Sequence, residues 1–137
     1  MLDSELQEIR EKKLQDLKRN VISKPNPIND SRNEVIEIDS NNFENIITSN
    51  EWVIIDCWAV WCMPCKMMAP IFKKLAKEYG HKVQFAKLNT DLNPQIAMKF
   101  EIMAIPAFIL LHKGQLVQKV IGAVGEPGLR KILAPIK

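Results

Sequence analysis

A dense apolar run from Trp52 to Val60 leads directly into two cysteines, Cys62 and Cys65, which open a helical pattern that continues to about Tyr79. Such a run is typical of a strand buried on both faces, and strands that lead into helices build α/β folds. Cysteines three residues apart at the start of a helix lie on one face, with Cα atoms about 5–6 Å apart, which a disulfide accepts. This stretch therefore predicts an α/β fold with a dithiol where a strand meets a helix.

The two cysteines are expected to differ in reactivity. If Cys62 lies at the first helical turn, free backbone N–H groups and the helix dipole favour its thiolate, which is the reactive form. We expect an exposed attacking thiol at Cys62 and a more sheltered resolving thiol at Cys65. A disulfide this short adds little stability through chain entropy, and Cys57, His81 and His112 do not supply a second pair of zinc ligands. The pattern favours a redox-cycling dithiol and no metal.

The segment W-C-M-P-C-K, from Trp61 to Lys66, resembles the active site of thioredoxins, which is usually W-C-G-P-C-K. The resemblance continues in V-I-I-D-C-W-A before the motif, in K-L-N-T-D-L-N-P after it, and then in I-M-A-I-P-A-F and I-G-A. It departs from the family at Met63, where glycine is usual, and at Cys57, where an aromatic residue is common. The resemblance implies a thioredoxin-like fold, with a central mixed β-sheet sandwiched by helices. It also implies a thiol–disulfide oxidoreductase that reduces other proteins without a cofactor.

Composition restricts the partners and the location. The chain has 137 residues, of which 47% are hydrophobic and 26% charged, as in ordinary globular proteins. Its net charge of +3 is not gathered into a basic stripe, so no nucleic-acid partner is expected. No apolar run reaches the roughly 18 residues of a membrane span, and the N-terminus lacks the apolar core of a signal peptide. Three cysteines, which leave one unpaired, do not resemble an extracellular disulfide framework, so we expect a cytoplasmic protein.

The first 33 residues have no counterpart in a minimal thioredoxin. Residues 3–20 read as a helix with one apolar stripe, formed by Leu2, Leu6, Ile9, Leu14, Leu17 and Val21. The proline- and asparagine-rich residues 22–33 indicate a linker, so the thioredoxin-like domain is predicted to span residues 34–137. Three roles of the helix stay open: docking on its own domain, pairing with a partner or a second copy, or fraying. We expect a monomer, with this helix as the element for any self-association.

The rest of the chain alternates between helix and strand patterns. The expected strands are 35–38, 52–58, 83–89, 107–111 and 116–121, and the expected helices are 42–47, 62–79, 91–100 and 127–133. Pro70 is expected to kink its helix, and Gly114 suits a hairpin turn between the last two strands. This order predicts a mixed sheet that begins with a βαβ unit.

Asp56 is the exception in its apolar strand. A lone ionised carboxylate in a core costs several kcal/mol, so Asp56 should be neutral, paired or hydrated, unless it lies exposed at the strand end. It lies six residues before Cys62, as does the buried aspartate of thioredoxins, which implies a proton acceptor for the cysteine pair. Lys87 matches a lysine that the family places near this aspartate. The alternative for Lys87 is a side chain that lies along the sheet with its amine in water.

The resemblance also implies a substrate-binding surface beside Cys62. Thioredoxins carry a cis-proline that faces the dithiol, so the Ile105–Pro106 bond is expected to be cis and to turn the backbone of Ile105 toward an extended substrate. The expected substrate-binding residues, which we call the collar, are Trp61, Met63, Ile105, Pro106, Gly122 and Ala123. Ordinary gap-filling is the alternative for Met63 and Met103.

The expected reaction starts when the Cys62 thiolate attacks a substrate disulfide and forms a mixed disulfide. Cys65, with Asp56 accepting its proton, then displaces the reduced substrate. A flavin-dependent donor of the thioredoxin-reductase type is expected to reduce the protein again. Two rivals stay open: catalysis in the oxidising or isomerising direction, and a non-catalytic module whose dithiol senses redox state. Glutathione-coupled reduction also stays open, although Trp61 and the Met-Pro between the cysteines differ from glutaredoxins.

Overall fold

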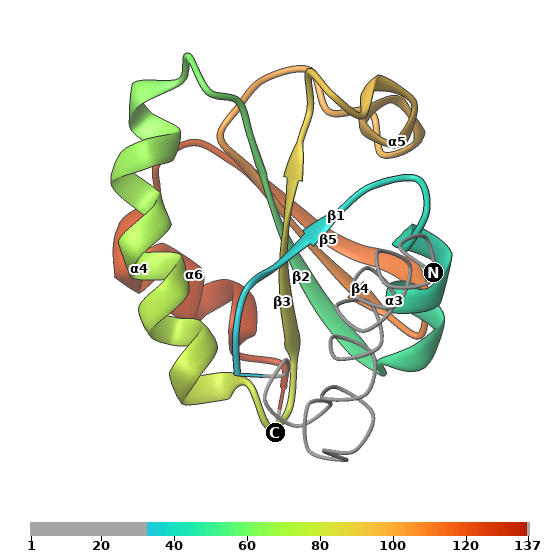
Figure 1. Cartoon of the computed structure of the whole chain (residues 1–137). Helices are drawn as coiled ribbons and strands as arrows, with labels where there is room; N and C mark the ends of the chain where they lie inside the picture. The colour runs from blue at the N-terminus through green and yellow to red at the C-terminus, as the bar shows by residue number, and fades with distance from the viewer. Residues whose placement is uncertain (1–32, 137) are drawn as a thin grey trace, which may run out of the picture. The chain divides into compact units, whose positions relative to one another are not determined.

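The computed structural model describes residues 33–136, and Figure 1 draws these residues in colour. The predicted helix over residues 3–20, and the predicted linker except for Asn33, lie outside the described residues. The boundary between this extension and the following domain stays a prediction. Among the described helices, none is both long and apolar enough to cross a membrane.

Five strands form one mixed sheet in the spatial order β1-β3-β2-β4-β5. They are β1 (Ile36–Ile38), β2 (Trp52–Trp58), β3 (Gln84–Asn89), β4 (Ala107–His112) and β5 (Gln115–Ile121). Strands β1 and β2 run parallel to β3, whereas β4 runs antiparallel to β2 and β5 antiparallel to β4. The predicted mixed sheet is therefore confirmed, with β2 at its centre.

Four helices cover the sheet within residues 33–136. They are α3 (Phe43–Ser49), α4 (Met63–Tyr79), α5 (Pro94–Lys99) and α6 (Gly125–Leu133). Buried side chains of α4 and α6 pack on one face of the sheet, and those of α3 and α5 pack on the other. Figure 1 shows α4 and α6 together on the left and α3 on the opposite side. This arrangement is the predicted sandwich of helices around a central sheet.

Strand β2 is apolar on both faces because both faces are covered. Val53, Ile55 and Cys57 belong to the core under α3 and α5, while Ile54 belongs to the core under α4 and α6. Successive side chains of a strand point to opposite faces, so Asp56 shares the face of Ile54. The strand therefore carries its single carboxylate into the layer between the sheet and α4.

Helices α3, α5 and α6 each differ from the predicted bounds by two residues or more at one end. Helix α3 ends at Ser49, two residues after the expected end. Helix α5 begins at Pro94 and not at 91, because the side chain of Asn89 first accepts hydrogen bonds from the backbone N–H groups of Asp91 (3.0 Å) and Leu92 (3.1 Å). Helix α6 begins at Gly125, two residues before the expected start. Helix α4 passes through Pro70 as one helix, and the kink expected there stays a prediction.

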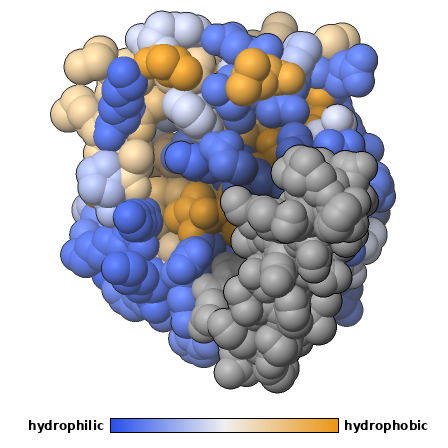
Figure 2. Space-filling model, viewed as in Figure 1, coloured by the Kyte–Doolittle hydropathy of each residue, from blue (hydrophilic) through white to orange (hydrophobic). Residues whose placement is uncertain are grey.

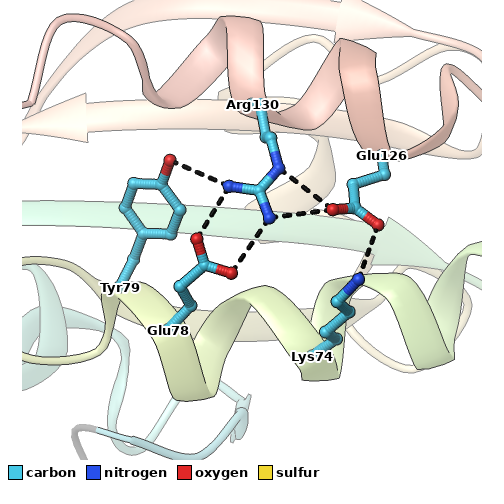
Figure 3. A network of polar contacts seen from close by, with 5 residues as sticks. All are labelled: Lys74, Glu78, Tyr79, Glu126 and Arg130. Atoms are coloured by element: carbon cyan, nitrogen blue, oxygen red, sulfur yellow. Dashed lines mark hydrogen bonds and ion pairs between the residues drawn. The ribbon is translucent and has the colours of Figure 1, made fainter.

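A network of charged side chains joins α4 to α6 (Figure 3). The guanidinium of Arg130 donates two hydrogen bonds to Glu78, at 2.7 and 2.9 Å, and two to Glu126, at 3.0 and 2.8 Å. Lys74 donates to the other oxygen of Glu126 at 3.0 Å, and Tyr79 accepts from Arg130 at 3.4 Å. The hydrogen bond from Arg130 lowers the pKa of Glu78, and those from Lys74 and Arg130 lower the pKa of Glu126. The network ties α4, the helix that carries the dithiol, to α6.

Candidate active site

Cys62 lies immediately before α4 and caps the helix with its own sulfur. Its backbone is extended, with φ −92° and ψ 106°, and its N–H donates to the carbonyl of Ala59 at 3.1 Å. The Sγ atom accepts a hydrogen bond from the backbone N–H of Cys65 at 3.2 Å. An N-cap acceptor is stabilised by the free N–H groups and the positive end of the helix dipole. The predicted position of Cys62 at the helix start is therefore confirmed, and this position favours a thiolate.

Cys62 and Cys65 form a disulfide, with Cα atoms 5.3 Å apart. The predicted contrast between an exposed and a sheltered thiol is wrong for this state, since Cys62 is 3% exposed and Cys65 is 2% exposed. The reason is packing: both residues cluster with Ala59, and the side chains of Trp58 and Ile105 lie against them. A disulfide that reacts with Cys62 must therefore contact the residues that surround this cysteine.

The loop before β4 supplies one side of this surrounding surface. The Ile105–Pro106 peptide bond is cis, as predicted, and Ile105 is half-buried against the two cysteines. The backbone N–H of Gly122 donates to the carbonyl of Pro106 at 2.8 Å. Gly122 has φ 116°, a conformation that glycine adopts readily and other residues rarely do. This hydrogen bond brings the Gly122–Ala123 loop beside the cis-proline loop, although both lie far from Cys62 in the sequence.

Trp61 and Met63, which flank Cys62 in the chain, are both exposed large apolar side chains. The Nε1 of Trp61 donates a hydrogen bond to Oδ2 of Asp91 at 2.8 Å. Apolar atoms are visible at the upper end of Figure 2, where β2 leads into α4 in Figure 1. Asp91 was not among the site residues predicted from the sequence. A signal existed, because Asp91 follows β3 and Trp61 follows the parallel strand β2, and the carboxyl ends of parallel strands meet at one edge.

Asp56 is buried in β2, 3% exposed, so the alternative of an exposed residue at the strand end is wrong. Its Oδ1 makes no hydrogen bond to any described residue. Burial raises the pKa of Asp56 to about 7, and the nearby ammonium of Lys87 offsets part of this rise. A carboxyl group with a pKa near neutrality can take up a proton and release it again.

A cavity of about 620 Å³ reaches Asp56 from the face that carries α4 and β1. It lies between α4 and the segment that leads into β1, and its lining includes Lys73, Lys77 and Lys87. A hollow is visible on this face in Figure 2. Neither cysteine lines this cavity. The cavity is large and polar enough for water to contact the carboxyl group.

Lys87 lies beside Asp56, and the two residues are partners in the pairing of β2 with β3. Its Nζ lies 4.9 Å from the centroid of the Trp58 ring and 3.8 Å from Oε2 of Glu37. The side chain is partly exposed, so the ammonium does reach the surface, as the alternative expected. It also acts on Asp56, because its charge favours the ionised carboxylate.

Cys57 is a free thiol that is fully buried on the other face of β2, under α3 and α5. Burial raises the pKa of this thiol far above its ordinary value, and the neighbouring Asp56 adds to the rise. Such a thiol is inert, so the chemistry of this region belongs to Cys62 and Cys65. Within residues 33–136, no three His, Cys, Asp or Glu side chains are grouped so that they could hold a metal ion.

Comparison with known proteins agrees with this geometry. The sequence model of the thioredoxin family matches residues 34–135. Thioredoxin from Mycobacterium tuberculosis is 38% identical over 98 residues, which are 72% of this chain and 84% of that protein. The bifunctional thioredoxin reductase/thioredoxin of Mycobacterium leprae is 37% identical over 110 residues, which are 78% of this chain but 24% of that longer protein.

A solved structure shows the same fold. Mitochondrial thioredoxin 3 from Saccharomyces cerevisiae, in its oxidised form, superimposes with a TM-score of 0.68 at 38% sequence identity. The match covers 77% of this chain and 98% of the yeast chain. The family match and the shared fold show that this chain belongs to the thioredoxin family, whose members reduce protein disulfides, and that it is a thiol–disulfide oxidoreductase.

Proposed function

We propose that the chain works in the reducing direction on disulfides of other proteins, with Cys62 as the attacking residue. The observation that carries this proposal is the hydrogen bond from the N–H of Cys65 to Sγ of Cys62, at the start of α4. A sulfur held there is stabilised as a thiolate in the reduced protein. The thiolate attacks one sulfur of the substrate disulfide, and the other substrate sulfur leaves as a thiolate.

Cys65 completes the reaction. Its thiolate attacks Cys62 in the mixed disulfide, re-forms the Cys62–Cys65 bond and releases the second substrate sulfur as a thiolate. The two electrons pass from the dithiol to the substrate. Asp56 accepts the proton of Cys65, through water, and passes it to the cavity beside it. Its pKa of about 7 supports this role, because the carboxyl group is then close to half ionised at neutral pH. Lys87 lowers the pKa of Asp56 and so favours its ionised form, which can accept the proton.

The collar is proposed to bind the substrate segment that carries the disulfide. Exposed Trp61 and Met63 offer apolar contact. The backbone of Ile105, before the cis-proline, is proposed to offer hydrogen bonds to an extended chain. The carbonyl of Pro106 accepts a hydrogen bond from the N–H of Gly122, which joins the cis-proline loop to the Gly122–Ala123 loop. None of the six collar residues is charged, so the collar suits substrates of varied sequence.

The electron donor is proposed to be a flavin-dependent reductase of the thioredoxin-reductase type. The M. leprae relative supports this pairing, because its name joins a thioredoxin reductase to a thioredoxin in one protein. We further propose that the chain acts in the cytoplasm, in electron transport and redox homeostasis, as a monomer with its domain at residues 34–137. These last points rest on the sequence and on the family.

The test is to trap the mixed disulfide. Cys65→Ser leaves Cys62 able to attack but removes the resolving thiol, so a substrate with a single disulfide should stay covalently bound to Cys62. Non-reducing electrophoresis and mass spectrometry of the cross-linked peptides identify the bond. Cys62→Ser is the matched control and should trap nothing. A trap that forms through Cys65 in the Cys62→Ser protein would reverse the proposed roles.

A further inference from the structure

Besides the two sulfurs of the dithiol, the active site carries a third oxidisable sulfur, the thioether of Met63. Met63 is 64% exposed, whereas Met68 on the same helix is 2% exposed. Three other described methionines are exposed too, Met67, Met98 and Met103, but none of them lies between the two cysteines. The family usually has glycine at the position of Met63, so this side chain is a departure at the centre of the site. A methionine at such a surface supplies a flexible, polarizable and apolar contact.

The disulfide state leaves Met63 as the accessible sulfur of the dithiol motif. Cys62 and Cys65 are joined and buried, and the thiol of Cys57 is fully buried in the core. Hydroperoxides react with thiolates and with thioethers according to exposure. When the dithiol is oxidised, no thiolate of the pair remains to react, and the Met63 thioether stays open to solvent.

We propose that Met63 is a site of reversible oxidation by hydroperoxides, and that its sulfoxide weakens the binding of protein substrates to the collar. This proposal rests on the proposed function of the collar. In the reaction the O–O bond of the peroxide breaks and an S–O bond forms. The thioether sulfur loses two electrons, and the peroxide is reduced to water or an alcohol. The product is polar where the reduced side chain is apolar.

The position of Met63 explains why this modification affects function. It lies between the two cysteines, at the start of α4, two residues after exposed Trp61. A protein substrate must cover this surface to bring its disulfide to the buried Cys62. A polar sulfoxide would then have to be desolvated against the substrate, which weakens binding. A small disulfide that contacts only the sulfur atoms escapes most of this cost.

The experiment uses the full chain in its disulfide form. Hydrogen peroxide is added, then removed with catalase, and mass spectrometry measures the sulfoxide content of each methionine peptide. Dithiothreitol then restores the dithiol, and the rate of disulfide reduction is compared with that of an untreated sample. We expect oxidation of Met63 but not of Met68, and a rise in KM for a protein disulfide of about three- to tenfold. The rate with a small aromatic disulfide should change less than about twofold, because this substrate does not cover the Met63 side chain when it binds.

Variants separate Met63 from the other exposed methionines. Met63→Leu keeps an apolar side chain without sulfur, and its treated and untreated samples should have the same KM. Met67→Leu is the matched control, one turn further along the exposed side of α4, and it should still lose affinity on treatment. A methionine sulfoxide reductase, supplied with dithiothreitol, should restore the KM of the treated wild-type protein.

Three results would overturn the proposal: an unchanged KM when mass spectrometry shows Met63 sulfoxide, protection of Met63 from oxidation, or equal losses in the Met63→Leu and wild-type proteins. Failure of the proposed function is distinct from these. It would show as an untreated protein that reduces no protein disulfide at all.

Discussion

The indole nitrogen of Trp61 donates a hydrogen bond to a carboxylate oxygen of Asp91 across the ends of two parallel strands, at 2.8 Å. Trp61 is exposed and has no other hydrogen bond to a described side chain. This single contact therefore fixes the orientation of a large apolar ring beside Cys62. It connects the loop after β3 to the collar, although no residue of that loop was expected at the site.

Removing this acceptor should loosen the ring and weaken substrate binding. Asp91→Ala should raise the KM for a protein disulfide about three- to tenfold, the effect of losing a contact of about 1 kcal/mol. Asp91→Asn retains an acceptor oxygen and should stay close to the wild type. Steady-state kinetics on both variants checks the prediction, and equal KM values for Asp91→Ala and the wild type would contradict it.

The buried carboxyl group of Asp56 should make stability depend on pH. Its pKa is raised by burial from an ordinary 3.8 to about 7, so between these values the folded protein holds a proton that the unfolded chain has released. The free energy of unfolding must therefore fall as pH rises through this window, by at most about 1.4 kcal/mol per pH unit. Once the pH is well above 7, Asp56 is ionised in both states and this contribution no longer changes.

Asp56→Asn removes the group that titrates. The variant should match the wild type near pH 4 and become more stable by about 1–3 kcal/mol at pH 7. Urea denaturation from pH 4 to pH 8 measures the two curves. Glu44→Gln, which replaces an exposed carboxylate on α3, is the control and should keep the slope of the wild type. Parallel curves for Asp56→Asn and the wild type would show that Asp56 does not titrate in this window.

The sequence was sufficient for the parts of the fold in which pattern and packing agree. Strand β2 and helix α4 were predicted to within a residue. A continuous apolar run fits a strand covered on both faces, and an apolar stripe of helical period fits a helix packed on one side. Helix α5 was predicted too long, since its start depends on how the side chain of Asn89 binds the following backbone. Such a local hydrogen bond leaves no periodic pattern in the sequence.

The site was harder to predict wherever it depends on contacts between distant segments. The positions of the dithiol, the cis bond at Pro106 and the burial of Asp56 were all expected. The burial of Cys62 was not, because it depends on Ile105, which lies more than forty residues away. Asp91 was missed for the same reason.

The network around Arg130 was also absent from the prediction, and it offers a test that is independent of the chemistry. Arg130→Met keeps an unbranched apolar stem but removes the four hydrogen bonds to Glu78 and Glu126. We expect a Tm lower by a few degrees and an unchanged rate of disulfide reduction, since none of these groups touches the dithiol. Arg130→Lys retains the charge but not the two-pronged geometry, and it should give an intermediate Tm.

High salt gives a second check on this network. The difference in Tm between Arg130→Met and the wild type should shrink at about 1 M salt, because the charged groups are partly exposed and become screened. A difference that stays constant with salt would point to lost packing of the arginine stem and not to its charge.

Whether the Cys62–Cys65 pair is a reductant is decided by its equilibrium potential. Met63 adds an apolar side chain but no charge beside Cys62, so the potential should lie within about 30–40 mV of the value near −270 mV that is general for thioredoxin. Titration against a glutathione redox buffer, with alkylation and mass spectrometry of the two cysteines, measures it. A potential in this reducing range is the expected result. A value near −120 mV, typical of strong oxidants, would contradict it.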